Sequence, residues 1–417
     1  MRITYVCSDR GVPIGGTKGA SIHVRAVAQA LTKRGHEVRL LATRAESPPP
    51  AFRPRVIDVG FDRLLKQFRQ AIDGDGDALL AKEAYNLLLN TRLRQALAEM
   101  NAQWPVDAVY ERYSLWSWAG LHFAREHGIP WLLEVNAPLV DEQQNYRELS
   151  LRPVARGLER VLMREADAVI VPTAGLRPHV WEAAGKRRKI HVVPNGADLD
   201  LFEHPPCAPP REVADRLRDR FVVAFLGTLK PWHGVGLLLR AFERLRRKVP
   251  SAHLLVIGDG PTRPLVEEAM HEAGPDSVTL TGSVAHDEVP GWLALADVGV
   301  APYPPLDEFY FCPLKIIEYL AAGLPVVASD IGELPRLVRH ERTGLIVPAG
   351  DTRELASALV RLAEQARERE RMGRRALQQA RRRHGWPRAA ERIERILTDC
   401  SVKREPSRRL AVVQAGS

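Results

Sequence analysis

An alternation of short apolar strands and helices dominates this chain and limits its fold to the α/β class. The first forty residues begin with a strand-like run around Tyr5, pass through a glycine-rich turn from Gly11 to Gly19, and continue with apolar residues at helical spacing. Gly35 ends the predicted helix, and a second apolar strand follows at Val38 to Leu41. Parallel strands need a helical crossover between them, so this order predicts a β-α-β unit in a parallel sheet.

The alternation runs through two successive halves of the chain. The first half contains an irregular stretch at 47–105, with one or two helices predicted over Leu79 to Leu97, and further strands at Ala108 to Tyr110, Trp131 to Val135, Ala168 to Val171 and Ile190 to Val193. The second half has predicted strands at Phe221 to Leu226, His253 to Ile257, Val278 to Leu280, Val298 to Ala301, Val326 to Ala328 and Leu345 to Val347. A length of 417 residues also favours two domains.

We therefore expect two Rossmann-like, doubly wound parallel-sheet domains, over residues 1–200 and 201–385. The proline-rich stretch from Asp198 to Arg211 is the predicted linker. Residues 386–417 should hold a C-terminal helix and then a polar tail from Lys403 to Ser417. Such sheets bind ligands at the carboxyl ends of their strands, so the loops at those ends are the candidate sites.

The chain is basic, with 60 Lys and Arg against 51 Asp and Glu, a net charge of +9. A solvated arginine-rich surface, an anionic small-molecule substrate and an anionic membrane surface all account for this charge. Nucleic acid is the least favoured partner, because no nucleic-acid-binding motif accompanies the charge. The basic and apolar segment Arg63 to Arg69 is predicted to be a surface helix, with peripheral membrane contact as the alternative.

The sequence favours a cytoplasmic location, with peripheral attachment at the inner membrane face as an alternative. The longest apolar stretches, such as Leu324 to Ala328, are far shorter than the roughly 18 residues that a membrane span needs. The N-terminus has no signal-peptide layout. Cys7, Cys207, Cys312 and Cys400 are widely separated, which fits neither a paired metal site nor a disulfide framework.

Two glycine-containing loops enter helices and could bind phosphate. Gly16 and Gly19 lie at the mouth of the first helix, where backbone N–H groups and the helix dipole favour anions, although a plain turn would look the same. The loop from Gly227 to Gly234 follows a buried strand. Its Lys230 could neutralise a diphosphate, and its His233 could act as a donor or a titratable group.

A third segment, from Phe311 to Ala328, is the most informative. Its loop enters a helix that has Lys315 in the first turn and Glu318 about one turn deeper, and that ends at a glycine before a buried strand. The lysine is placed for a phosphate, and the carboxylate can bind two ribose hydroxyls bidentately. A solvated Lys–Glu pair at i, i+3 is the competing interpretation.

At this segment the chain resembles family 4 of the retaining glycosyltransferases, the glycogen-synthase-like group with the GT-B fold. The resemblance extends over most of residues 1–395 and includes Val193 to Asp198, Gly258 to Pro261 and Thr343 to Pro348. It implies two Rossmann-like domains that face each other across a cleft, with the acceptor on the N-terminal side and the nucleotide-sugar on the C-terminal side. It also implies that the helix around Trp386 to Leu397 crosses back to the first domain.

The resemblance assigns roles to individual residues. Glu318 would hold the nucleotide ribose, and the backbone from Cys312 through Pro313 and Leu314 to Lys315 would face the sugar and the diphosphate. Gly282 and Val284 would lie beside the base, while Gly19 and Gly16 would let the backbone approach the diphosphate or the acceptor.

Three positions depart from the family pattern. Tyr310 stands where the family often has a second glutamate, eight residues before the ribose-binding one. Thr228 stands in the place of an arginine, which leaves Lys230 and His233 for the diphosphate, with Lys315 as a partial replacement. Asn136 stands in the place of a histidine. We take Lys230, Lys315 and Asn136 as the candidate catalytic residues and His233, Tyr310 and Thr228 as further donor-binding candidates.

The resemblance implies retaining transfer of a sugar from a nucleotide diphosphate, UDP- or GDP-linked, to a hydroxyl of a glycan, lipid-linked or small-molecule acceptor. No bound cofactor is expected, and cationic side chains are expected to replace a metal. A noncatalytic nucleotide-sugar sensor or partner subunit of the same fold is the alternative. A nicotinamide-dependent oxidoreductase is disfavoured, because no G-x-G-x-x-G follows the first strand.

Overall fold

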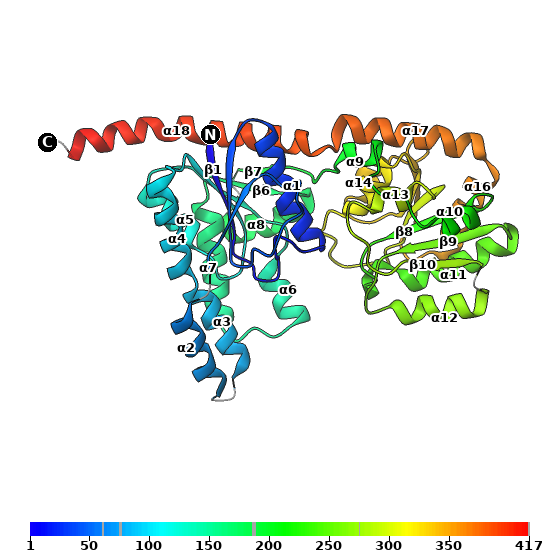
Figure 1. The fold of residues 1–417 in the computed structure, drawn as a ribbon, viewed down its shortest axis with the longest axis horizontal. Coiled ribbons are helices and arrows are strands. Elements are labelled where there is room, and N and C mark those ends of the chain that lie inside the picture. The colour runs from blue at the N-terminus through cyan, green and yellow to red at the C-terminus, as the bar shows by residue number, and fades with distance from the viewer. Residues whose placement is uncertain (61, 75–76, 186–188, 275, 416–417) are drawn as a thin grey trace. The chain divides into compact units, whose positions relative to one another are not determined.

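The computed structural model describes residues 1–60, 62–74, 77–185, 189–274 and 276–415. They form two compact units: unit 1 comprises Met1–Pro194 and Trp386–Ser417, and unit 2 comprises Asn195–Gly385 (Figure 1). The division falls at Pro194, slightly before the expected residue 200. No described helix has both the length and the apolar character needed to cross a bilayer.

Unit 1 is built on a seven-stranded parallel sheet in the order β3-β2-β1-β4-β5-β6-β7. Its strands are β1 (Arg2–Cys7), β2 (Glu37–Ala42), β3 (Arg55–Asp58), β4 (Ala108–Arg112), β5 (Trp131–Glu134), β6 (Ala168–Val171) and β7 (Ile190–Val192). The inner strands are almost wholly buried, as their continuous apolar runs predict. The edge strand β3 was not predicted, because the charged Arg55 and Asp58 at its ends are exposed and break the apolar pattern.

The helices of unit 1 cover this sheet and add a projecting hairpin. They are α1 (Gly19–Lys33), α2 (Arg63–Gly74), α3 (Ala78–Leu88), α4 (Asn90–Gln103), α5 (Ala119–Glu126), α6 (Leu139–Tyr146), α7 (Arg152–Glu165), the 3-10 turn η1 (Ala174–Leu176), α8 (Arg177–Ala184) and α18 (Trp386–Ala415). Figure 1 shows α2 and α3 as an antiparallel pair that extends away from the sheet. The region over Leu79 to Leu97 thus contains two helices, α3 and α4.

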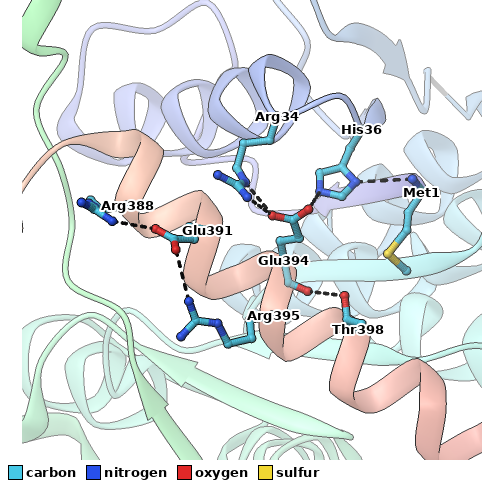
Figure 2. Close-up of polar contacts among 8 residues, drawn as sticks. All are labelled: Met1, Arg34, His36, Arg388, Glu391, Glu394, Arg395 and Thr398. Carbon is cyan, nitrogen blue, oxygen red and sulfur yellow. Dashed lines mark hydrogen bonds and ion pairs between the residues drawn. The ribbon is translucent and has the colours of Figure 1, made fainter.

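Helix α18 belongs to the core of unit 1, although it lies at the far end of the sequence. Trp386, Ile393 and Leu397 are buried in the same apolar cluster as α1 and β1. Figure 2 shows the polar part of this contact, in which the Glu394 carboxylate pairs with Arg34, whose Nε lies 2.6 Å from Oε2, and with the ring of His36 at 3.4 Å. The helix continues to Ala415, where the sequence predicts a polar tail, and residues 416–417 lie outside the described residues.

Unit 2 contains a six-stranded parallel sheet in the order β10-β9-β8-β11-β12-β13. The strands are β8 (Phe221–Leu226), β9 (Ala252–Ile257), β10 (Val278–Leu280), β11 (Val298–Ala301), β12 (Val326–Ser329) and β13 (Gly344–Val347). The helical elements are α9 (Leu199–Glu203), α10 (Arg211–Leu217), η2 (Pro231–His233), α11 (Val235–Lys248), α12 (Arg263–Ala273), α13 (Val289–Leu293), α14 (Leu314–Ala321), α15 (Leu334–Leu337), α16 (Thr352–Glu364) and α17 (Ala366–Arg383).

The linker predicted over Asp198 to Arg211 is wrong. This stretch lies within unit 2 and opens with the short helix α9. Leu199 and Phe202 of α9 pack against the apolar cluster of unit 2, so the segment is anchored in spite of its prolines.

Both sheets reverse their winding direction at the first strand of the unit. β1 lies between β2 and β4, and β8 lies between β9 and β11. In doubly wound sheets this reversal opens a crevice at the carboxyl ends of the strands, where ligands bind. The loops after β8 and β11 in unit 2, and after β1 and β4 in unit 1, are therefore the places to examine for a site.

Candidate functional site

The loop after β8 approaches the side chain of Lys315 closely. Gly227 ends the strand with a φ of +123°, a conformation that L side chains rarely adopt. A Cβ atom at Gly227 would lie 3.5 Å from Cε and Nζ of Lys315. Gly258, at the end of β9, packs so tightly on this loop that a Cβ there would lie 2.2 Å from the carbonyl oxygen of Gly227. The two glycines therefore let the ends of β8 and β9 pack against each other, with Gly227 next to Lys315.

Lys315 is a buried cation without a hydrogen-bond partner. Only 7% of the residue is exposed, and its Nζ has no hydrogen-bond partner among the described residues. The ammonium lies 4.2 Å from the ring centroid of Phe225 and 5.5 Å from that of Tyr303, and both rings stabilise a cation weakly. Burial lowers the pKa of Lys315 to about 7, although Glu318 acts in the opposite direction. A group in this state is suited to an anion that enters from solvent.

His233 is held as a neutral ring beside the two lysines. Its Nδ1 lies 2.5 Å from the carbonyl oxygen of Thr228, so Nδ1 carries the proton and Nε2 is left as an acceptor. Burial, together with the charges of Lys315 and Lys230, lowers the pKa of His233 to about 4, although the hydrogen bond to Thr228 acts in the opposite direction. The ring therefore accepts hydrogen bonds at neutral pH and adds no charge. The charge of Lys315 acts on the ring more strongly than that of Lys230.

Aromatic residues after β11 form the wall behind Lys315. The ring of Tyr303 contacts those of His233, at 5.6 Å between centroids, and Phe309, at 5.0 Å. Phe311 packs on Phe309 at 4.5 Å, and the intervening Tyr310 contacts Phe311 at 5.1 Å. Of these rings Tyr303 reaches the ammonium of Lys315, and Phe309 and Phe311 pack against Tyr303. The carboxylate that the family often has at the position of Tyr310 is replaced here by an aromatic ring.

The segment from Cys312 to Glu318 carries the candidate ligands into α14. Burial raises the pKa of the Cys312 thiol to about 12, so this cysteine is not a nucleophile. Pro313 precedes the helix and Leu314 is its first residue. Leu314 and Lys315 lie in the first turn, where backbone N–H groups have no partner within the helix.

Glu318 is oriented by a histidine that sequence reasoning missed. Its Oε1 lies 3.0 Å from Nε2 of His286, and no hydrogen bond from the described residues reaches Oε2. The carboxylate is nearly buried, with 11% of the side chain exposed. His286 follows the segment Gly282 to Val284, which the family resemblance places beside the base. The sequence therefore pointed to the loop, but gave no signal for its contact with Glu318.

Gly282 and Val284 lie on the loop after β10. Gly282 has a φ of +71° and forms a bridge with Gly258, so it is joined to the β9 end described above. Val284 is partly buried against the apolar cluster that contains α14. Thr228 is exposed, and its carbonyl oxygen, rather than its side chain, contacts His233.

The remaining candidates lie in unit 1, in the segments that follow the carboxyl ends of β1 and β5. A Cβ at Gly16 would lie 2.9 Å from Oγ of Ser21, and Arg25 donates to the Gly16 carbonyl oxygen at 2.7 Å. Gly19 is the first residue of α1. Asn136 follows β5, and its buried Nδ2 has no hydrogen-bond partner among the described residues. Nη1 of Arg112, at the end of β4, is buried and has none either.

A buried hydrogen bond between His23 and Glu134 lies at the same end of the unit 1 sheet. Nε2 of His23 lies 2.6 Å from Oε1 of Glu134, and the hydroxyl of Tyr5 donates to Oε2 at 3.0 Å. Burial alone would raise the pKa of Glu134, but the charge and hydrogen bond of His23, together with Arg112, lower it to about 2. The ring of Trp386 contacts His23 at 5.5 Å, so α18 helps to fix this pair.

The structure therefore brings His233, Lys315 and Tyr303 together in unit 2, with Glu318 one helical turn from Lys315. Lys230 belongs to the same loop as His233, and its Nζ lies 5.6 Å from the ring centroid of Trp232. Asn136, Gly16 and Gly19 form a separate set in unit 1. Among the described residues, no group of three or more His, Cys, Asp or Glu side chains is arranged to hold a metal ion.

Comparison with known families matches both halves of the chain. The model described as "Glycosyltransferase Family 4" matches residues 17–201, and the model described as "Glycosyl transferases group 1" matches residues 220–365. Together they cover most of the two sheets.

Two curated relatives differ in how much of the chain they match. The GDP-mannose-dependent α-(1-6)-phosphatidylinositol monomannoside mannosyltransferase of Mycobacterium tuberculosis is 33% identical over 218 residues, which is 51% of this chain and 57% of that protein. The chain thus spans little more than half the length of this relative. The glycogen synthase of the same organism is 25% identical over 99% of both chains.

Among solved structures, sucrose-phosphate synthase from Thermosynechococcus elongatus has a similar fold. The TM-score is 0.71 and the identity 21%, with 96% of this chain and 99% of that chain covered. At this identity the likeness establishes the fold, which is the GT-B class with two parallel-sheet α/β domains.

We predict that Lys315→Met stabilises the protein at pH 7. A lysine whose pKa is lowered on folding destabilises the folded state below its unfolded pKa of 10.5, and the cost is nearly complete once the pH has fallen to about 7. Methionine fills similar space without the charge, so the free energy of unfolding should rise by about 2 to 4 kcal/mol at pH 7 and by much less near pH 10. Denaturant unfolding at the two pH values measures this. An equal or lower stability of the variant at pH 7 would show that the buried ammonium does not destabilise the folded protein.

Proposed function

Because the chain belongs to family 4 of the glycosyltransferases, we propose that it transfers a sugar from a nucleotide-diphosphate donor to a hydroxyl acceptor with retention of anomeric configuration. The observation that supports this most is the buried, unpaired ammonium of Lys315 beside the β8 loop. A diphosphate would supply the charge and the hydrogen-bond acceptors that Lys315 lacks.

The proposed reaction is a displacement at the anomeric carbon. The bond from this carbon to the diphosphate oxygen breaks, a bond to the acceptor oxygen forms on the same face, and the acceptor proton passes to the leaving diphosphate. Lys230 and Lys315 stabilise the charge that develops on the leaving group. Neutral His233 accepts a hydrogen bond from a sugar hydroxyl through Nε2. Glu318, oriented by His286, receives the ribose hydroxyls on Oε2.

The choice of donor and acceptor is also a proposal. One relative is named for GDP-mannose and a phosphatidylinositol monomannoside, and one structure of similar fold contains UDP-glucose, so GDP-mannose and UDP-glucose lead the donor panel. Glycan, lipid-linked and small-molecule acceptors all enter the acceptor panel. The departures at Thr228, Tyr310 and Asn136 favour one further candidate, a noncatalytic nucleotide-sugar sensor. Donor binding without any transfer or hydrolysis would identify that function.

We expect one of UDP, GDP and ADP to raise the unfolding temperature clearly and Glu318→Ala to remove most of this shift. Loss of the ribose contacts should weaken nucleotide binding at least about tenfold, or 1.4 kcal/mol. A thermal-shift titration measures both. Glu243→Ala, on an exposed carboxylate of α11 that pairs with Arg247, is the matched control and should bind as the native protein does. An unchanged affinity in Glu318→Ala would contradict the ribose assignment.

Transfer should be independent of metal ions, because Lys230 and Lys315 supply the positive charge that a metal would otherwise provide. We expect EDTA to leave the rate of donor consumption unchanged. Loss of activity in EDTA that Mg²⁺ or Mn²⁺ restores would contradict this.

We also propose peripheral contact of α2 with an anionic membrane surface. Leu64 and Phe68, spaced i, i+4 on the projecting hairpin of Figure 1, are 69% and 55% exposed. The same helix carries Arg63, Lys66 and Arg69. Apolar side chains next to basic ones suit an interface with anionic lipids. A cytoplasmic location remains part of this proposal, and the four free cysteines fit a reducing compartment.

The double variant Leu64→Ser, Phe68→Ser should bind vesicles with anionic lipid at least about tenfold more weakly, since each buried side chain contributes roughly 1.5 to 3 kcal/mol. Co-sedimentation with phosphatidylglycerol-containing vesicles measures this. Leu265→Ser, which removes another exposed leucine from α12, is the control and should bind like the native protein. No binding of the native protein, or equal binding of the double variant, would contradict the membrane contact.

A further inference from the structure

A second candidate site lies wholly within unit 1. A cavity of about 300 Å³ opens at the carboxyl ends of β1, β2 and β3. Its walls come from the loops after these strands and from the α3–α4 junction, and they comprise Arg10, Thr43, Arg44, Ala45, Glu46, Asp58, Gly60, Tyr85 and Leu89. This volume is at the lower end of the range for small-molecule sites, so the cavity suits a single small ring. None of the residues assigned to the nucleotide-sugar lines it.

The side chains around the cavity can both donate and accept hydrogen bonds. Arg10 and Arg44 offer guanidinium donors, while Glu46 and Asp58 offer carboxylate acceptors. The formal charges of these four groups cancel, which favours an uncharged ligand. A sugar ring presents hydroxyls that donate and accept, so it can use both kinds of group.

These side chains use only part of their hydrogen-bonding capacity on one another. Nη2 of Arg44 lies 2.8 Å from Oε1 of Glu46, and these side chains are 54% and 41% exposed, so water or a ligand can reach them. The guanidinium of Arg10 lies over the ring of the buried Tyr85, 5.1 Å from its centroid, and this contact holds Arg10 at the cavity.

The backbone at Glu46 is held in an unfavourable conformation. Its φ of +45° is in the left-handed region, and Glu341 in unit 2 is the other non-glycine residue in this region among those described. Strain of this kind persists only where neighbours enforce it, and it is concentrated at functional sites. Here the enforcing neighbour is the glycine loop before α1. The N–H of Gly15 donates to the Ala45 carbonyl oxygen at 3.1 Å, and a Cβ at Gly15 would lie 2.4 Å from the carbonyl oxygen of Ser47.

We propose that this cavity binds an uncharged sugar ring, the acceptor of the transfer. The proposal rests on the function proposed above and names the chemical class of its acceptor. Glu46 accepts hydrogen bonds from ring hydroxyls, Arg10 and Arg44 donate to them, and Tyr85 holds Arg10 in position. The glycine loop before α1 fixes the 44–47 loop through Gly15, and in that conformation the Glu46 carboxylate lies at the cavity.

Direct binding to the full chain tests this without any need for turnover. Saturation-transfer NMR would use methyl α-glucopyranoside, methyl α-mannopyranoside and myo-inositol as neutral probes at millimolar concentration, and glucose 6-phosphate as the charged one. We expect at least one neutral probe to bind and Glu46→Gln to raise its dissociation constant about tenfold. Binding of no neutral probe, tighter binding of glucose 6-phosphate, or an unchanged constant in Glu46→Gln would overturn the proposal.

A pair of glycine variants separates binding from folding. Glu46→Gly and Glu341→Gly both relieve a positive φ, so neither should lower the unfolding temperature. Only Glu46→Gly should lose the neutral probe, and equal binding by both variants would overturn the proposal. The nucleotide thermal shift is measured on the same proteins. A chain that binds the probe but no nucleotide would refute the transferase function, whereas one that binds nucleotide but no neutral probe would refute only the cavity.

Discussion

The unpaired ammonium of Lys315 is the constraint on which the account of this protein depends. A lysine buried to 7% exposure without a hydrogen-bond partner is costly, and its lowered pKa of about 7 expresses that cost. The two aromatic rings beside Lys315 offset only a part of this free-energy cost, because a cation–π contact is weaker than a salt bridge with hydrogen bonds. A diphosphate would remove the penalty and would be bound more strongly because of it.

The rest of unit 2 can be understood as the means of placing this charge. The winding reversal at β8 opens the sheet edge, and Gly227 and Gly258 let two strand ends approach each other. From its first turn α14 projects Lys315 toward the β8 loop, and from the next turn it projects Glu318 toward His286 on the loop after β10. His233 stays neutral beside the lysines, so it adds an acceptor without adding a third positive charge. The arrangement thus concentrates charge where a leaving group would need it.

The sequence predicted most of the framework because buried parallel strands are continuous apolar runs. β8, β11 and β6 agree with their predicted ranges residue for residue. β3 was missed because an edge strand with charged ends lacks that run, and the predicted linker was wrong because prolines at 205–210 do not prevent the preceding residues from packing as α9.

The sequence predicted which residues form the site, but it did not predict which residues surround them. The motif around Lys315 and Glu318 is local, so it could be read directly from the chain. The burial of Lys315 depends on Phe225 and Tyr303, and the orientation of Glu318 depends on His286, all of which come from other segments. The cavity of unit 1 depends likewise on four separate loops, and the backbone strain at Glu46 leaves no mark in the sequence.

The most direct test of the central claim is the proton balance of nucleotide binding. Isothermal titration calorimetry at pH 8, in buffers of different ionisation enthalpy, measures the protons taken up when the nucleoside diphosphate binds. Lys315 is mostly neutral at that pH and the phosphate is already ionised, so an anion at the ammonium should cause uptake of close to one proton (~0.9) per molecule. Lys315→Met should bind more weakly and take up none. Nucleotide binding without proton uptake, or equal uptake by the variant, would show that the diphosphate does not lie against Lys315.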